Sequence, residues 1–125
     1  LGTPNALKIL NFISSEEVPV YQGAFRPLRG SFVYAYNYHG PSGLTARIKS
    51  SIRSYESQKG EDFIAEYVNR YAGEITIVAL GPLTNIARAF RKNPTLSQRV
   101  DRIYVMGGAV ECSGNVTPWA EFNYI

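Results

Sequence analysis

Hydrophobic residues recur at helical spacing in two parts of the chain. Near the start, this pattern predicts a helix over about residues 4 to 14, with apolar positions at Leu7, Leu10 and Ile13. The second pattern predicts an amphipathic helix that stops at Gly73, with apolar positions at Phe63, Ile64, Tyr67, Val68 and Tyr71. Two acidic residues precede it, where the helix dipole favours negative charge: Glu61 and Asp62.

Shorter apolar runs predict strands. Residues 18–21 form one that ends at Gly23, and residues 75–80 and 103–106 form two more that we expect to be buried. Residues 32–38 alternate strictly, with all four aromatic side chains at even positions, which predicts a further strand. Its aromatic face would serve either as an edge or subunit contact or as a platform on which bases stack.

The order of these elements predicts an α/β fold. A helix should run from Gly81-Pro82 to about Lys92, and Thr95 should cap a short helix after the Asn93-Pro94 break. Strands that alternate with helices indicate a mostly parallel sheet covered by helices, a Rossmann-like open α/β arrangement. Ligands bind beyond the carboxyl ends of such strands. Three glycine-containing loops leave those ends, at residues 23–44, 81–85 and 107–123, and together they predict a site.

The last of these loops carries the most specific chemistry. After the apolar run that ends at Met106, it presents Asn115, Glu121 and Asn123 within nine positions. A carboxylate accepts hydrogen bonds from hydroxyls, and a carboxamide both donates and accepts them. This set predicts a pocket for the vicinal hydroxyls of a sugar or another polyol.

Three further residues have both a structural and a functional interpretation. The backbone carbonyl of Leu80 ends a strand, either as part of a simple Gly81 turn or as one oxygen ligand of a hard cation such as calcium. His39 is the only histidine and stands in a loop on the predicted ligand side, where it would be structural, bind a ligand or transfer a proton. Cys112 has neither a C-x-x-C partner nor a neighbouring base, so we do not expect a nucleophile.

Composition narrows the class of protein. The chain has 125 residues, 45% hydrophobic and 18% charged, which is typical of one soluble globular domain. Its thirteen Lys and Arg are dispersed despite a net charge of +3, so we expect no nucleic-acid partner. No run approaches the about 18 apolar residues of a membrane span, and the first ten residues lack a basic leader before an apolar core, so we expect no signal peptide. With one cysteine and no internal disulfide, a cytoplasmic location is expected.

Several segments resemble the nucleoside hydrolase family, of the inosine-uridine preferring type. They are V-A-L-G-P-L-T-N-I-A, V-M-G-G-A-V and G-N-V-T-P-W-A-E-F-N, with P-V-Y-Q-G-A-F-R-P-L and H-G-P-S-G-L before them in the family's order. The similarity covers essentially the whole chain, and A-E-F-N is its most specific block. It implies calcium-dependent cleavage of the N-glycosidic bond of ribonucleosides, giving ribose and a free base.

The resemblance also implies roles for single residues. Asn115, Glu121 and Asn123 would bind ribose hydroxyls, and Met106 would contact the sugar through its backbone. Leu80 would give its carbonyl to calcium, and His39 matches a histidine that lines the nucleoside pocket. A homodimer or homotetramer is implied as well.

Two parts of the family pattern have no counterpart in this sequence. The family's D-x-D-x-x-x-D-D cluster, which supplies the base and most calcium carboxylates, is absent, and so is its C-terminal His-Asp pair. The only aspartates, Asp62 and Asp101, open a helix and precede a strand, so neither should replace the cluster. We therefore expect residues 1–125 to be the central part of a single hydrolase domain, with no catalytic residue of its own and no activity alone.

Two other classes of function stay open at this point. The chain could be a non-catalytic ribose- or nucleoside-binding domain, or a structural fragment that needs further segments to fold. The preference for purines or pyrimidines is also open, because Tyr34, Tyr36, Tyr38 and Trp119 could each stack on a base or simply pack.

Overall fold

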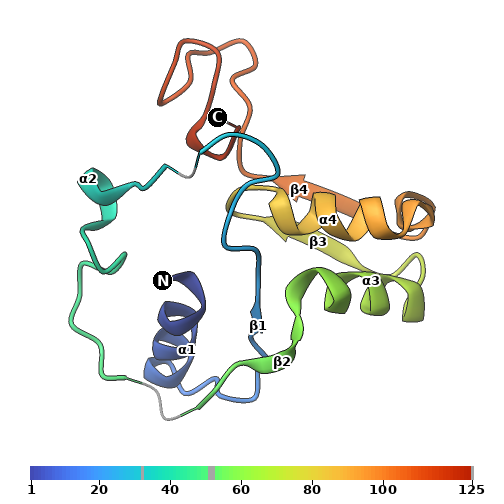
Figure 1. Ribbon diagram of the computed structural model, residues 1–125, viewed down its shortest axis with the longest axis horizontal. Helices are drawn as coiled ribbons and strands as arrows, with labels where there is room; N and C mark the ends of the chain where they lie inside the picture. Colours follow the sequence, from blue (N-terminus) through green and yellow to red (C-terminus); the bar gives the residue numbers. More distant parts are fainter. Residues whose placement is uncertain (32, 51–52, 125) are drawn as a thin grey trace. The chain divides into compact units, whose positions relative to one another are not determined.

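The computed structural model describes residues 1–31, 33–50 and 53–124, in two compact units, Leu1–Gly60 and Glu61–Ile125 (Figure 1). The elements are α1 (Gly2–Phe12), β1 (Tyr21–Gln22), α2 (Tyr36–His39), β2 (Glu56–Lys59), α3 (Gly60–Arg70), β3 (Thr76–Ala79), α4 (Thr84–Lys92), η1 (Pro94–Gln98), β4 (Arg102–Val105) and η2 (Phe122–Tyr124). Parallel strands alternate with helices along the chain, so the predicted α/β class is confirmed.

The first unit contains α1, α2 and the parallel pair β1–β2. Helix α1 confirms the first predicted helix and buries Leu7 on its inner side. Strand β1 lies later than the predicted 18–21, because pairing with β2 decides where it forms: Tyr21 is opposite Glu56. The sequence Glu56–Lys59 is polar, so its strand was not predicted. Gly60 ends this pair, and a side chain there would approach the Gln22 carbonyl oxygen to 3.3 Å.

The predicted strand over residues 32–38 is wrong. Tyr36–His39 forms a helical turn, in which the N–H groups of Tyr38 and His39 both donate to the Ala35 carbonyl at 3.0 Å. Phe32, the first position of the pattern, lies outside the described residues. An alternating pattern specifies a strand only where a neighbouring strand pairs with it and buries one face. In the described residues no strand pairs with this segment, and Tyr34 and Tyr36 instead stack on each other with ring centroids 4.8 Å apart.

The second unit is built on the parallel pair β3–β4, which confirms both predicted strands. Four residues of each strand are in continuous register, from Thr76 opposite Arg102 to Ala79 opposite Val105. Figure 1 shows α3 and α4 beside this pair. The core gathers residues of both helices, of η1 and of the segments around the strands: Val68, Ala89 and Leu96, with Ile64, Ala65, Ile75, Ile77, Phe90 and Val100 packed against them.

The expectation that both strands are buried is correct for one face only. Ile77 faces the core, whereas its neighbour Val78 is 59% exposed and the opposite residue Tyr104 is 56% exposed. Side chains of a strand alternate between the two faces. The helices α3 and α4 pack against the face that carries Ile75 and Ile77, so the other face of this pair is open.

The helices of this unit follow the sequence pattern closely. Helix α3 ends at Arg70 and is followed by Gly73, whose φ of +80° favours glycine. Helix α4 starts at Thr84, so Pro82 lies ahead of the helix rather than in its first turn. The predicted cap at Thr95 is also displaced: the Asn93 side chain caps η1 by accepting from the Thr95 N–H. Thr95 lies inside η1, and the N-cap position is occupied by Asn93, a residue type preferred there.

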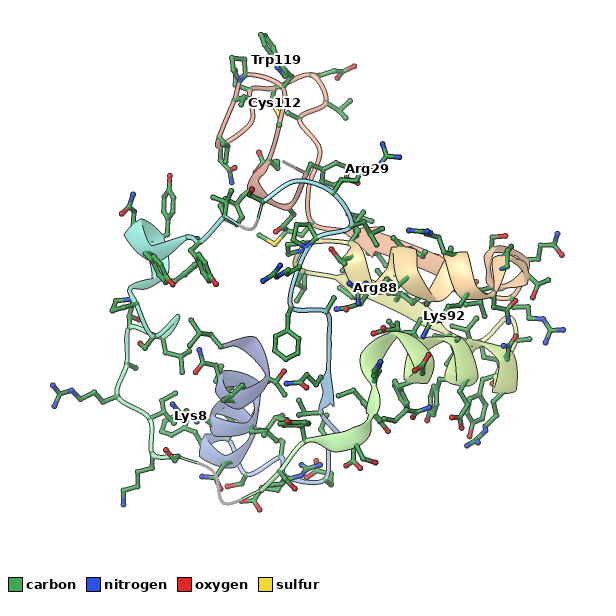
Figure 2. All side chains as sticks on the ribbon, viewed as in Figure 1. Lys8, Arg29, Arg88, Lys92, Cys112 and Trp119 are labelled. Carbon is green, nitrogen blue, oxygen red and sulfur yellow. The ribbon has the colours of Figure 1, made fainter. Side chains whose placement is uncertain are left out.

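Two ion pairs connect α3 with α4. Lys92 contacts Asp62 at 2.6 Å, and Arg88 lies 3.7 Å from Glu61, a side chain that is only 6% exposed. In Figure 2, Arg88 and Lys92 are labelled on α4. The exposed pair with Lys92 contributes about 0–1 kcal/mol, as surface pairs do. The buried Glu61 depends more on its partner, because a buried carboxylate that is left unpaired costs folding free energy.

None of the helices among the described residues combines the length and the apolar character needed to cross a membrane.

Candidate functional site

The carboxyl ends of β3 and β4 lie side by side, as the sequence predicts. The N–H of Met106 donates to the Ala79 carbonyl at 2.8 Å, so Leu80 and Met106 both leave the sheet at the same edge. Both side chains are mostly exposed, at 71% and 62%. Two of the three predicted loops therefore begin at one place, and the third belongs to the first unit.

The loop that follows β4 returns to the strand it left. Asn123 donates from Nδ2 to the carbonyl oxygen of Met106 at 2.8 Å, across 17 positions of sequence. Asn115 accepts at Oδ1 from the N–H of Phe122 at 3.0 Å, across 7 positions. These two bonds bring together three of the residues predicted for the polyol site, Met106, Asn115 and Asn123.

A tight turn shapes the middle of this loop. Thr117 and Ala120 exchange backbone hydrogen bonds at 3.3 Å, and Gly114 donates to the Pro118 carbonyl at 3.2 Å. A side chain on Gly114 would collide with the Ala120 carbonyl, so only glycine fits there. The turn leaves Trp119 80% exposed, and Figure 2 shows it with Cys112 on the part of the loop far from β4.

The backbone partners fix which atom each carboxamide has left for a ligand. A backbone N–H can only donate, so the atom of Asn115 that faces Phe122 must be its oxygen, and its NH₂ group is left as a donor. A backbone carbonyl can only accept, so the atom of Asn123 that faces Met106 must be its nitrogen, and its oxygen is left as an acceptor. The pair therefore offers the NH₂ group of Asn115 as a donor and the oxygen of Asn123 as an acceptor.

Glu121 lies between these two asparagines in the sequence and is half-buried. Its backbone carbonyl accepts from the Tyr124 N–H at 2.8 Å, which closes the short helix η2. Among the described residues, no hydrogen bond or ion pair is recorded for its carboxylate. An acceptor on this loop suits a hydroxyl ligand, and its charge suits a developing cation.

The described residues do not form a complete calcium site. Calcium takes about six to eight oxygen ligands, commonly with several carboxylates. The described residues bring no group of three or more His, Cys, Asp or Glu side chains together. The Leu80 carbonyl, at the end of β3, could supply one oxygen, so this residue set does not by itself fit the ion.

Neither aspartate lies at the ligand edge. Asp62 opens α3 and pairs with Lys92. Asp101 directly precedes β4, at its amino end, where it accepts from Thr76 at 3.2 Å and from Arg102 at 2.9 Å. Hydrogen bonds with Tyr104 and then Asp101 raise the pKa of Arg102. Both carboxylates are thus engaged in ion pairs, and both lie where the sequence places them, at the start of a helix and before a strand.

His39 belongs to the first unit, where it ends α2 and is exposed. The loop after it is attached to α1: Asn5 donates from Nδ2 to the Ser42 carbonyl at 2.8 Å. Gly40 and Gly43 have φ of +67° and +72°, and a side chain on Gly43 would lie 3.0 Å from the same Asn5 nitrogen. His39 and residues 106–123 belong to different units, each described by itself.

Three contributors to these loops were not predicted from the sequence: the Phe122 N–H, the Asn5 side chain and the ring of Tyr124, which lies against Gly107. Nothing in the local pattern singles out Asn5 or Phe122. The sequence signal for the Tyr124 contact would have been Gly107, because a glycine often marks a close approach of another group to the backbone.

Comparison with known proteins identifies the family of the chain. The family described as inosine-uridine preferring nucleoside hydrolase matches residues 1–125, the whole chain. The chain belongs to this nucleoside hydrolase family.

Individual relatives support the same assignment. The chain is 39% identical over 125 residues to a probable uridine nucleosidase 2 of Oryza sativa subsp. japonica, and the match covers 98% of the chain and 37% of that protein. A plant nucleoside hydrolase, the PpNRh1 enzyme, has a TM-score of 0.90 and 42% identity over 97% of the chain and 39% of that structure. A purine-preferring ribonucleoside hydrolase from Gardnerella vaginalis has a TM-score of 0.92 and 35% identity, over 98% and 40%.

The chain therefore has the nucleoside hydrolase fold over a length well below that of its relatives. It spans 37% of the curated rice relative and about two fifths of each solved structure.

Proposed function

We propose that the protein containing this chain hydrolyses the N-glycosidic bond of ribonucleosides, releasing ribose and a free base. Membership of the nucleoside hydrolase family supports this reaction class. The observation that carries the proposal is the loop closed by the Asn123–Met106 and Asn115–Phe122 bonds, because it gathers polar groups suited to a sugar at the ligand edge of the sheet.

The free atoms of the loop suit the hydroxyls of ribose. We assign the Asn115 NH₂ group as a donor to a hydroxyl oxygen, and the Asn123 oxygen and the Glu121 carboxylate as acceptors of hydroxyl protons. Holding the ring orients C1′ toward an attacking water. The water adds its oxygen to C1′, the C1′–N bond breaks, and the base leaves with the electron pair and is protonated.

Glu121 has a second proposed role. Glycosidic cleavage passes through an oxocarbenium-like state with positive charge on the sugar. A carboxylate beside the ribose stabilises that charge more than it stabilises the neutral substrate. Glu121 is half-buried, and no cation pairs with it among the described residues, so its charge is free to act in this way.

Only one atom of the described residues is proposed as a calcium ligand. The Leu80 carbonyl would be one of its oxygen ligands, and the described residues hold no group of three or more His, Cys, Asp or Glu side chains that would complete the site. No catalytic step is therefore assigned to the ion. Removal of divalent cations from the complete protein with a chelator is expected to abolish turnover, and calcium is expected to restore it; unchanged activity after exhaustive removal would contradict a calcium requirement.

The base side of the pocket is assigned from the sequence. We propose that His39 lines it, as its place in the H-G-P-S-G-L segment suggests. The relatives differ in base: the rice protein is named a uridine nucleosidase, whereas the Gardnerella enzyme is purine-preferring. Inosine and uridine should therefore both be tested as substrates.

The complete protein should release free base and ribose from inosine or uridine, measured by chromatography and a reducing-sugar assay. Matched 2′-deoxyribonucleosides should be cleaved much more slowly, because they lack one hydroxyl that the loop binds. Saturable ribose binding without turnover would instead indicate a non-catalytic binding domain. The absence of both ribose binding and turnover would refute both functions. Residues 1–125 alone are expected to be inactive, and hydrolysis by this segment would contradict that expectation.

Assembly and location are also part of the proposal. We expect a homodimer or homotetramer in the cytoplasm, with the exposed Cys112 as a free thiol. Light scattering of the complete protein and fractionation of its source cells would test these two points.

A further inference from the structure

We infer that Tyr124 is a positioning residue, whose ring latches the end of the sugar-binding loop to the backbone at the end of β4. The inference rests on the proposed function, since it concerns the same loop. Tyr124 neither binds the sugar nor is one of the polar loop residues assigned to it, and its ring explains why position 107 is a glycine.

The contact between Tyr124 and Gly107 is close. A Cβ atom built on Gly107 would lie 2.5 Å from both Cδ2 and Cε2 of the Tyr124 ring, and 3.8 Å from its Cγ. Carbon atoms in van der Waals contact are about 3.5–4.0 Å apart. The ring therefore occupies the space that any side chain at position 107 would need, and it lies directly against the glycine.

The latch has two adjacent parts. Asn123 holds the Met106 carbonyl by a hydrogen bond of 2.8 Å, and the next residue, Tyr124, packs on the next residue of the strand end, Gly107. Two consecutive residues at the end of the loop thus meet two consecutive residues at its start. Because there are two adjacent points of contact, the loop end is held at a set distance and is also restricted in rotation about the hydrogen bond.

The latch also reaches Glu121. The short helix η2 contains Asn123 and Tyr124, and the Tyr124 N–H donates to the carbonyl of Glu121, directly before it, at 2.8 Å, so the three residues form one piece. A ring that leaves Gly107 would allow this piece to turn, and the Glu121 and Asn123 side chains would turn with it. Misplacement of polar groups by about 1 Å can lower catalysis by about 10²-fold.

The ring is a latch rather than a core residue. Tyr124 is 52% exposed, and the core of this unit gathers around Val68, Ala89 and Leu96. Its loss should therefore lower the melting temperature little. Its contact with Gly107 is made by ring carbons, which phenylalanine also has.

The experiment compares Tyr124→Phe, Tyr124→Ala and Gly107→Ala in the complete protein. Tyr124→Phe should keep wild-type kinetics. Tyr124→Ala should lower kcat/KM for a ribonucleoside by about 10- to 100-fold, and should reduce the preference for the ribonucleoside over its 2′-deoxy analogue. A merely structural role would lower the amount of active enzyme but would leave that preference unchanged. Tyr71→Ala, at a half-exposed tyrosine near the end of α3, serves as the matched control.

A double-mutant cycle tests the contact itself. Gly107→Ala should be harmful alone, because its methyl group meets the ring, and it should be much less harmful in the Tyr124→Ala background. Additive effects of the two substitutions would overturn the latch.

Amide hydrogen exchange over residues 106–124 separates this inference from the proposed function. If the wild-type protein cleaves no nucleoside, the proposed function fails, yet faster exchange in Tyr124→Ala and normal exchange in Tyr124→Phe would still support the latch. If the wild type is active and Tyr124→Ala matches it in kinetics and exchange, the latch is refuted.

Discussion

Asn123 donates a hydrogen bond of 2.8 Å to the carbonyl oxygen of Met106, and this bond joins the two ends of the loop that follows β4. The bond occupies the nitrogen of the Asn123 side chain and leaves its oxygen for a ligand. In Asn115 the oxygen is the occupied atom, since it accepts from the Phe122 N–H, and the NH₂ group is left for a ligand. Two residues of the same type thus have different chemical roles, and isosteric substitutions can separate them.

Asn123→Asp should open the loop. Aspartate has no N–H to give to Met106, and its charge would repel the carbonyl oxygen it faces. Loss of a hydrogen bond costs about 0.5–1.5 kcal/mol, and the repulsion adds to it, so kcat/KM for a ribonucleoside should fall at least about tenfold. Steady-state kinetics of the complete protein and amide exchange over residues 106–124 measure the two effects.

Asn93→Asp provides the matched control for that change. Asn93 uses only its oxygen, which accepts from the Thr95 N–H at 3.2 Å and the Thr95 hydroxyl at 2.6 Å. Aspartate keeps this acceptor, so stability and kinetics should stay close to those of the wild type. An Asn123→Asp variant as active as Asn93→Asp would refute the role of the Met106 bond.

Asn115→Asp should weaken sugar binding without opening the loop. The new carboxylate still accepts from the Phe122 N–H, but it has no NH₂ group to give to a hydroxyl. We expect a KM increase of about three- to tenfold, the value of one hydrogen bond, with amide exchange in the loop unchanged. Exchange as fast as in Asn123→Asp would show that the assignment of the two asparagines is wrong.

Glu121→Gln should lower kcat more than it raises KM. Glutamine keeps the size and an acceptor oxygen but loses the charge that would stabilise an oxocarbenium-like state. Loss of about 1.4–2.7 kcal/mol of that stabilisation corresponds to a fall of about 10- to 100-fold in kcat. Glu111→Gln removes a charge from an exposed position of the same loop and should have little effect. Equal effects of the two substitutions would argue against a specific role for Glu121.

Asn5→Ala should loosen the loop that follows His39. Its side chain provides the bond of 2.8 Å from α1 to the Ser42 carbonyl, and alanine cannot replace it. We expect a loss of about 0.5–1.5 kcal/mol in unfolding free energy and faster amide exchange around Gly43. Asn11→Ala, on the same helix, is the control. If His39 lines the pocket, Asn5→Ala should also raise KM, and an unchanged KM together with faster exchange would argue against that role.

The helices and strands of the second unit could be predicted because their signals are local. Each signal is complete within one short segment: the helical spacing of apolar residues from Phe63 to Tyr71, and the apolar run from Ile75 to Leu80. The predicted strand over residues 32–38 was wrong because a strand does not depend on local signals alone. Its alternation was present, but a strand also needs a partner, and pairing is decided between distant segments. Strand β2 was missed in the same way, because pairing with β1 forms it from polar residues.

The sequence by itself determined the family, the α/β class and the candidates Leu80, Met106, Asn115, Glu121 and Asn123, because motifs and periodic patterns are written in residue types and their spacing. It did not determine which atom of each asparagine a ligand meets. That depends on whether a backbone N–H or a carbonyl faces the side chain, from 7 or 17 positions away. Only the tertiary structure brings those partners together, and with them the ring of Tyr124 onto Gly107.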